Sequence, residues 1–340
     1  MDKTRLGRTG LMVSRSGFGA IPIQRIGAEE STALLRRAYE GGINFFDTAH
    51  GYTDSEEKIG RALSSVRENI VIATKTPAED SKTLFEDLEL SLLRLKTDYI
   101  DIYQVHNPET VPRPDDDTGL YEALVEAKRR GLVRFIGITN HRLPVALEAV
   151  ESGLYDTLQF PFSSLSSEAD LELVKAAREA DVGFIAMKAL SGGLIASAPS
   201  AFAFIRGTEY VVPIWGIQKP SELEEFLALE KDPPALDEAM RGIIEKDRAE
   251  LAGSFCRGCG YCLPCPAGIE ISTAARISFL MRRSRFEPFI TPEWQAKMES
   301  IEDCSGCGHC RECGPYELDT PRLLKAQLAE YREFVGGRSA

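Results

Sequence analysis

The sequence predicts an α/β fold: a parallel (β/α)8 barrel followed by a smaller module at the C-terminal end. Short runs of β-branched and aromatic residues alternate with longer amphipathic segments rich in Leu, Ala, Glu and Arg. Near-continuous apolar strands separated by helices are typical of a parallel sheet that helices cover on both faces. All eight cysteines lie beyond residue 255, which indicates a second module with different chemistry.

Seven strands are visible in this alternation, and an eighth is not. We expect the strands at residues 43–46, 70–73, 99–105, 134–138, 157–160, 183–186 and 211–214. We expect helices between them at residues 29–40, 83–95, 119–130, 144–151 and 168–180. This number of βα units favours a closed TIM barrel over an open doubly wound sheet. The segment 11–18 precedes the first unit and is expected to form a hairpin at the barrel floor.

A break in the pattern follows the barrel. The residues Lys231-Asp232-Pro233-Pro234 interrupt it, and residues 236–251 then read as a helix that leads into the cysteine region. We therefore expect a barrel domain over residues 1–250 and a second domain over residues 251–340. A chain of 340 residues is long enough for both.

Charge and hydropathy exclude some partners. The net charge of -12 disfavours nucleic acid and anionic membranes, because both usually bind a basic surface. The N-terminus carries no apolar signal segment, and no apolar run is long enough to span a bilayer. The sequence thus predicts a cytoplasmic protein with neither kind of partner.

Four polar residues stand where the first barrel strands end. Asp47 and Tyr52 follow the first expected strand, Lys75 follows the second, and His106 follows the third. Reacting groups of parallel barrels lie at this carboxyl-terminal face. There Tyr52 could donate a proton, with its pKa lowered from about 10 by the Lys75 cation. Asp47 would pair with Lys75, and His106 would orient a carbonyl group.

The run from Gly42 to Tyr52, GINFFDTAHGY, together with Lys75 and His106, resembles the aldo-keto reductase family. The likeness extends over about residues 4–230. It implies an NAD(P)H-dependent oxidoreductase that transfers hydride to an aldehyde or ketone without a catalytic metal.

The resemblance also implies residues that bind the coenzyme. Asn140 and Gln159 match the positions that hold the nicotinamide carboxamide in that family. Met187 stands where many relatives stack an aromatic side chain on the nicotinamide. Gly216 would approach the pyrophosphate, and Glu225 would contact the adenine. Both NADH and NADPH remain candidates, and a flavin is a further one.

The cysteines form two runs with the same spacing, C-x2-C-x2-C-x2-C. Thiolates at this spacing in a tight loop can hold three corners of one [4Fe-4S] cluster. Zinc more often binds two separated pairs, and disulfides are disfavoured in the cytoplasm. We therefore expect two [4Fe-4S] clusters, with these ligands: Cys256, Cys259, Cys262 and Cys265, then Cys304, Cys307, Cys310 and Cys313.

Each run resembles the bacterial ferredoxin motif, but two residues precede the fourth Cys here instead of three. In two-cluster ferredoxins the fourth Cys binds the other cluster, which implies an exchange of Cys265 and Cys313. Helical patterns at residues 272–283 and 292–301 make the module similar to α-helical ferredoxins. Aldo-keto reductase barrels with such a ferredoxin-like tail form a known subgroup, and the chain resembles it over nearly its whole length.

Two functions fit these features. The first is an enzyme that moves hydride between NAD(P)H and a small-molecule carbonyl, with clusters that connect it to a one-electron carrier of ferredoxin or flavodoxin type. The alternative is an electron-transfer or partner-docking iron-sulfur protein whose barrel binds a flavin or has no catalytic role. The complete set of four polar residues favours the enzyme.

Overall fold

The computed structural model describes residues 1–251, 255–283, 286–314, 316 and 318–337. Contacts divide the chain into two compact units. Unit 1 comprises Met1–Ala189 and Pro199–Arg241, and unit 2 comprises Leu190–Ala198 and Gly242–Ala340. The second unit therefore includes a short segment that precedes the last βα unit of the barrel in sequence.

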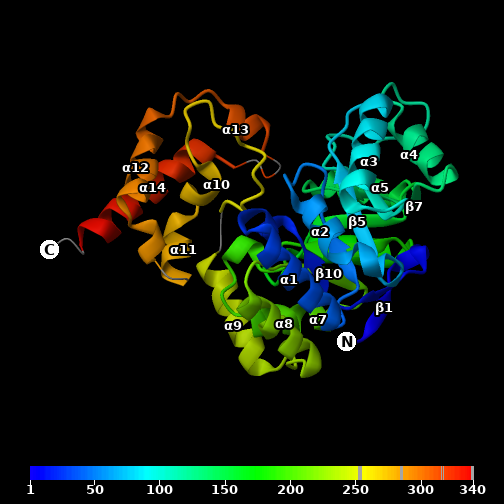
Figure 1. Cartoon of the computed structure of the whole chain (residues 1–340). Helices are drawn as coiled ribbons and strands as arrows, with labels where there is room; N and C mark the ends of the chain where they lie inside the picture. Colours follow the sequence, from blue (N-terminus) through cyan, green and yellow to red (C-terminus); the bar gives the residue numbers. More distant parts are fainter. Residues whose placement is uncertain (252–254, 284–285, 315, 317, 338–340) are drawn as a thin grey trace. The chain divides into compact units, whose positions relative to one another are not determined.

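Unit 1 contains a closed barrel of eight parallel strands, as the sequence predicts (Figure 1). Around the barrel the strands follow the order β10-β3-β4-β5-β6-β7-β8-β9. Their bounds are β3 Gly17–Gly19, β4 Phe45–Asp47, β5 Val71–Thr76, β6 Ile100–His106, β7 Val133–Thr139, β8 Thr157–Pro161, β9 Gly183–Met187 and β10 Val211–Gly216.

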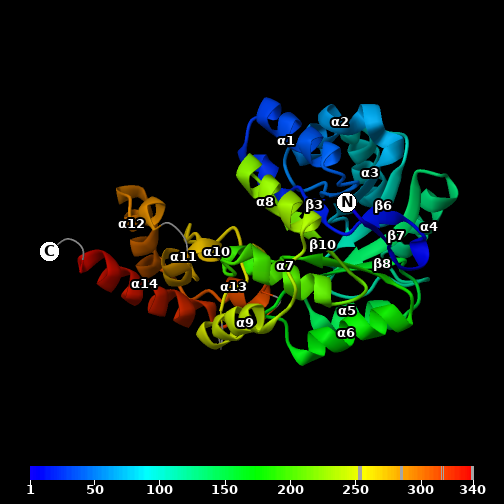
Figure 2. The ribbon, with the colours of Figure 1, turned by 90° about the horizontal axis from the view of Figure 1, so that it is seen from below.

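Helices surround these strands, as Figure 2 shows from below. They are α1 Ala28–Glu40, α2 Ser55–Leu63, α3 Ser81–Leu95, α4 Leu120–Arg129, α5 Leu143–Glu151, α6 Glu168–Glu179, α7 Ala198–Gly207 and α8 Pro220–Lys231. Helix α9, Glu238–Glu250, begins in unit 1 and continues in unit 2. Inside the barrel, apolar side chains such as Phe45, Ile102 and Ile185 form a common core. This packing fixes the strand ends that carry the polar residues.

The strand that the sequence pattern does not reveal is β3, Gly17–Gly19. Its Gly-Phe-Gly sequence contains no β-branched residue, so composition gives no strand signal. The glycine at position 17 has a packing reason, because a Cβ there would lie 2.8 Å from the Phe45 ring. The N-terminal hairpin pairs β1 Lys3–Arg5 with β2 Met12–Ser14. The expected hairpin at 11–18 is therefore wrong: the hairpin spans residues 3–14, and residues 17–19 belong to the barrel as β3, which pairs with β4 and β10.

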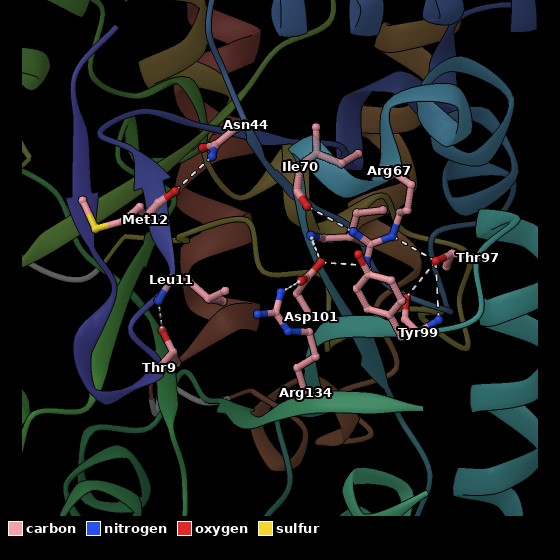
Figure 3. Close-up of polar contacts among 11 residues, drawn as sticks. Thr9, Leu11, Met12, Asn44, Arg67, Ile70, Thr97, Tyr99, Asp101 and Arg134 are labelled. Atoms are coloured by element: carbon pink, nitrogen blue, oxygen red, sulfur yellow. Dashed lines mark hydrogen bonds and ion pairs between the residues drawn. The ribbon is translucent and has the colours of Figure 1, made fainter. Parts of the chain in front are cut away.

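A buried ion-pair cluster lies near the beginning of β6 (Figure 3). Asp101 is fully buried and accepts hydrogen bonds from Arg67 Nη2 at 2.7 Å and Arg134 Nη1 at 2.6 Å. The backbone N–H of Ile72 donates to the same carboxylate at 3.0 Å. Because Asp101 and His106 stand at opposite ends of β6, this cluster supports the barrel and takes no part in the polar site.

Unit 2 is helical around the cysteine loops, as expected for an α-helical ferredoxin-like domain. Its helices are α10 Ile271–Ala274, α11 Ile277–Arg283, α12 Pro292–Glu299, α13 His309–Glu312 and α14 Thr320–Gly336. The pattern at 272–283 is split into two helices. The small core of this unit includes Cys256, Cys262, Ile277, Leu328 and Tyr331. Two cysteines thus belong to this core, although at 8% exposed they are its least buried members.

Membrane insertion finds no support in the helices. Among the described residues, no helix combines the length and apolarity that a bilayer crossing requires.

Candidate functional site

The four predicted polar residues lie at the carboxyl-terminal ends of three adjacent strands. Asp47 is the last residue of β4, Lys75 is the fifth of the six residues of β5, and His106 is the last of β6. Tyr52 lies in the loop between β4 and α2. Parallel pairing of β4, β5 and β6 brings these ends to one face of the barrel.

Asp47 and Lys75 form a buried ion pair. The Lys75 Nζ donates to Asp47 Oδ2 at 2.7 Å and to the carbonyl oxygen of Thr48 at 2.5 Å. Only 1% of Lys75 and 3% of Asp47 is exposed. Burial raises the pKa of Asp47 and lowers the pKa of Lys75, while their mutual attraction opposes both changes.

Tyr52 completes the group together with His106. The Lys75 Nζ lies 5.3 Å from the centre of the Tyr52 ring. The Tyr52 and His106 rings meet edge to face, with centroids 6.0 Å apart and an interplanar angle of 78°. A phenol beside a buried cation and an imidazole can deliver a proton to an oxygen that approaches both.

His106 is neutral at physiological pH. Burial, assisted by the nearby charge of Lys75, lowers the pKa of its imidazole from 6.5 to about 3. A neutral imidazole can donate a hydrogen bond to a carbonyl oxygen without competing with Tyr52 as the acid.

We expect the His106 imidazole to remain neutral from about pH 5 to pH 8, because its lowered pKa keeps it unprotonated there. The neutral form stabilises the folded protein above pH 6.5, and this stability is lost as the pH falls toward 3. NMR titration of the imidazole C–H signals, assigned by comparison with His106→Gln, checks this. A titration midpoint near 6.5 for His106 would contradict it.

Asn140 and Gln159, which are expected to hold the nicotinamide carboxamide, are buried, and their side chains form hydrogen bonds within the protein. The Asn140 Nδ2 donates to the carbonyl of Pro108 at 2.8 Å, and its Oδ1 accepts from the N–H of Arg142 at 2.8 Å. Gln159 lies in β8, and its Oε1 accepts from Gln104 Nε2 at 3.1 Å. Met187, the last residue of β9, is half-buried against the apolar core inside the barrel.

The expected phosphate and adenine residues lie at the next strand and helix. Gly216 ends β10 and is exposed, and a Cβ there would come within 3.3 Å of the Pro22 ring. Its bare backbone therefore fits the close approach of a phosphate group. Glu225 is exposed on α8. Glu222 accepts from the N–H groups of Gln218 and Lys219, so it caps the start of this helix.

Sequence reasoning missed two buried residues close to the ion pair. Glu56 in α2 is 1% exposed, accepts from Thr74 Oγ1 at 2.7 Å, and its charge raises the pKa of Lys75. Gln104 is fully buried, and its amide hydrogen-bonds toward Asp47. An acid in the first helical turn is usually a solvated capping residue, so the sequence around Glu56 carries no signal of burial.

The two cysteine runs share one backbone design. Each begins C-x-G-C-G-x-C, and all four glycines have a positive φ: Gly258 +62°, Gly260 +88°, Gly306 +66° and Gly308 +82°. Such left-handed turns aim successive N–H groups inward, and the Gly258 N–H lies 3.3 Å from Cys256 Sγ. The repeated turns support the same ligand role for both runs.

The thiols line two neighbouring cavities. Cys256, Cys259, Cys262 and Cys310 line the first. The second is lined by five cysteines, namely Cys262, Cys265, Cys304, Cys307 and Cys310. Cys265 thus shares a cavity with three cysteines of the second run, whereas Cys262 and Cys310 line both cavities. Cys313 is not among the lining residues of either cavity, and its Sγ lies 3.6 Å from His309 Nδ1.

This donor set fits iron-sulfur clusters. Burial raises the pKa of the Cys262 thiol to about 12, so its thiolate needs a nearby cation, which cluster iron provides. In the described part of the chain, no three His, Cys, Asp or Glu side chains converge closely enough to hold a single metal ion. The thiols are instead distributed over the two cavities.

Barrel, polar site and thiol loops together define an oxidoreductase with an iron-sulfur module. The aldo/keto reductase family model matches residues 16–201, and a 4Fe-4S dicluster domain model matches residues 255–319. The chain belongs to the aldo/keto reductase family, with a C-terminal ferredoxin-like domain, and is an NAD(P)H-dependent oxidoreductase.

Known relatives agree with this assignment. The uncharacterised oxidoreductase YqkF of Bacillus subtilis is 32% identical over 58% of this chain and 68% of its own length. The aldo-keto reductase YhdN of the same organism is 26% identical over 74% of this chain and 84% of its own. The holo structure of aldo-keto reductase AKR11C1 from Bacillus halodurans is 25% identical, with a TM-score of 0.63 over 73% of this chain and 96% of that one.

Proposed function

We propose that the barrel moves a hydride between NAD(P)H and the carbonyl group of a small aldehyde or ketone. When bound, the nicotinamide supplies the hydride. Tyr52 donates the proton to the carbonyl oxygen, and the Lys75 cation stabilises the phenolate that remains. Asp47 keeps Lys75 charged, and neutral His106 orients the carbonyl by a hydrogen bond. The observation that carries this proposal is the buried Lys75–Asp47 pair beside Tyr52.

The coenzyme residues follow from the same arrangement. Asn140 and Gln159 would hold the nicotinamide carboxamide, and Met187 would pack against the ring from inside the barrel. Gly216 would lie against the pyrophosphate, and Glu225 would contact the adenine. A barrel without catalytic function is disfavoured, because two charges buried as deeply as Lys75 and Asp47 cost stability.

The C-terminal domain holds, in this proposal, two [4Fe-4S] clusters that pass electrons singly to a ferredoxin-type or flavodoxin-type carrier. Cys265 serves the cluster of the second run, since it lies in the same cavity as Cys304, Cys307 and Cys310. A hydride carries two electrons together, and a hydride given to a carbonyl leaves none for the clusters. To reduce the clusters, a bound flavin would have to accept the hydride from NAD(P)H and release its electrons one at a time to the pair of clusters. We place the protein in the cytoplasm, where thiols stay reduced, with residues 1–250 and 251–340 as the two functional parts.

Tyr52→Phe tests the reductase. We expect carbonyl reduction with NADH or NADPH to fall by about 10²- to 10⁴-fold, because the general acid is lost while the ring packing is kept. The protein is purified anaerobically, its flavin, iron and sulfide are quantified, and oxidation of the coenzyme is followed with a panel of aldehydes and ketones.

The control is Tyr121→Phe, a second tyrosine that lies on α4, away from the four polar residues. It should reduce the same substrates at the wild-type rate. If Tyr52→Phe also retains full activity, the barrel works by another route, and a bound flavin would then support the electron-transfer alternative.

Single cysteine variants test the clusters. We expect about eight irons per chain in the wild type, and about four in Cys259→Ala and in Cys307→Ala, because each variant loses one ligand of one cluster. Ser305→Ala, which alters a residue inside the second run that is not a ligand, should keep all the iron. Iron content and EPR spectra after addition of NADH are measured. Full iron content in both cysteine variants would argue against these ligands.

A further inference from the structure

Gln104 contacts two residues of the proposed site that lie far apart in the sequence, Gln159 and Asp47. It lies on β6, two residues before His106, so the two side chains share the inner face of the strand. Its Nε2 donates to Gln159 Oε1 at 3.1 Å. Its amide also stabilises the charge of Asp47 by hydrogen bonding, as does the amide of Gln159.

Two unpaired oxygens lie in this group. Asp47 Oδ1 and Gln104 Oε1 are both buried, and neither has a well-formed hydrogen bond. Burial of such groups without a partner is unfavourable. Gln104 donates to Gln159, and the amides of both residues hydrogen-bond to Asp47, which pairs with Lys75. The three side chains therefore form one hydrogen-bonded group, in which loss of Gln104 would leave Gln159 Oε1 without its donor.

The barrel is shaped to accept Gln104. Gly137 is its partner in the pairing of β6 with β7. A Cβ at position 137 would lie 2.7 Å from Gln104 Cγ and 2.4 Å from Thr157 Oγ1. A side chain at position 137 would therefore displace the Gln104 side chain. The glycine leaves the space that Gln104 occupies.

We propose that Gln104 is a positioning residue that links the carboxamide-holding Gln159 to the Asp47–Lys75 pair, so that coenzyme binding and proton donation by Tyr52 depend on each other. This inference rests on the proposed reductase function. In this proposal Gln104 acts through its neighbours: it hydrogen-bonds to Gln159 on one side and favours the charged form of Asp47 on the other. A glutamine provides both a donor and an acceptor for this purpose, whereas an apolar side chain of the same length provides neither.

The test is a double-mutant cycle with Gln104→Met and Gln159→Met. Coenzyme dissociation constants are measured by protein fluorescence, and the single-turnover rate is measured in H₂O and in D₂O. We expect Gln104→Met to weaken coenzyme binding about fivefold, to slow the single turnover about tenfold, and to raise the solvent isotope effect. In the Gln159→Met background, Gln104→Met should weaken coenzyme binding no further.

Thr157→Val is the matched control, because Thr157 is buried beside Gly137 and its Oγ1 has no hydrogen-bond partner to lose. It should leave binding, rate and isotope effect unchanged. Strictly additive effects of the 104 and 159 variants on coenzyme binding, or an unchanged isotope effect in Gln104→Met, would overturn the inference. Failure of the proposed function looks different: wild-type protein would then reduce no carbonyl, whereas the binding cycle would still report the link between Gln104 and Gln159.

Discussion

Replacing Lys75 by methionine is expected to lower carbonyl reduction by about 10²- to 10⁴-fold and the free energy of unfolding by about 3–5 kcal/mol. Activity falls because Tyr52 loses the cation that stabilises its phenolate. Stability falls because Asp47, only 3% exposed, is left as an unpaired buried charge. Single-turnover rates and urea unfolding measure the two effects separately.

A double variant separates these causes. Asp47→Asn combined with Lys75→Met removes both charges, so most of the lost stability should return while the activity stays low. If the single Lys75→Met variant is as stable as the wild type, Asp47 is not charged in the folded protein. The pair would then not be the electrostatic unit described above.

Asp101→Asn is expected to lower the free energy of unfolding of the barrel by about 3–5 kcal/mol and to leave carbonyl reduction unchanged. The carboxylate is fully buried and pairs with Arg67, of which only 8% is exposed (Figure 3). Without that charge, the Arg67 guanidinium remains buried and uncompensated. Unfolding in urea is followed through the buried Trp215, in a Trp294→Phe background that removes the second tryptophan of the chain.

Arg134→Ala is the matched control, because the Arg134 side chain is 48% exposed and pairs with the same carboxylate. We expect it to cost at most about 1 kcal/mol. Equal losses of unfolding free energy in Arg134→Ala and Asp101→Asn would show that burial does not determine how much each ion pair of this cluster stabilises the barrel.

The barrel could be predicted because its strands are apolar and its four polar residues stand at strand ends. Strand β3 escaped prediction because Gly-Phe-Gly carries no propensity signal, and its pairing with β4 and β10 is a tertiary effect. The two cysteine runs could be recognised as candidate cluster ligands because cluster ligation requires a fixed spacing of the cysteines. The exchange of Cys265 and Cys313 stays a prediction: Cys265 shares a cavity with three cysteines of the second run, but Cys313 lines neither cavity.

Gln104 and Glu56 could not be found in this way. Both are polar residues in segments whose pattern indicates ordinary strand and helix, and nothing local distinguishes a buried amide or acid from an exposed one. Their burial depends on tertiary packing: for Gln104, the pairing of β6 with β7 sets Gly137 opposite it. Residues that act through neighbours need the folded structure to be recognised.

The segment Leu190–Ala198 groups with the second unit, so the chain passes between the two units at three points. Truncation of the chain near residue 250 would remove most of the second unit but keep this segment, which includes the fully buried Leu194. Such a truncation would remove the partners of this segment within the second unit, for example Arg276, which donates to the carbonyl of Gly192 at 2.7 Å. Cluster-free protein for comparison is better obtained from the full-length chain with its cysteines replaced. For the same reason, recombination that exchanges the whole second unit would need three junctions.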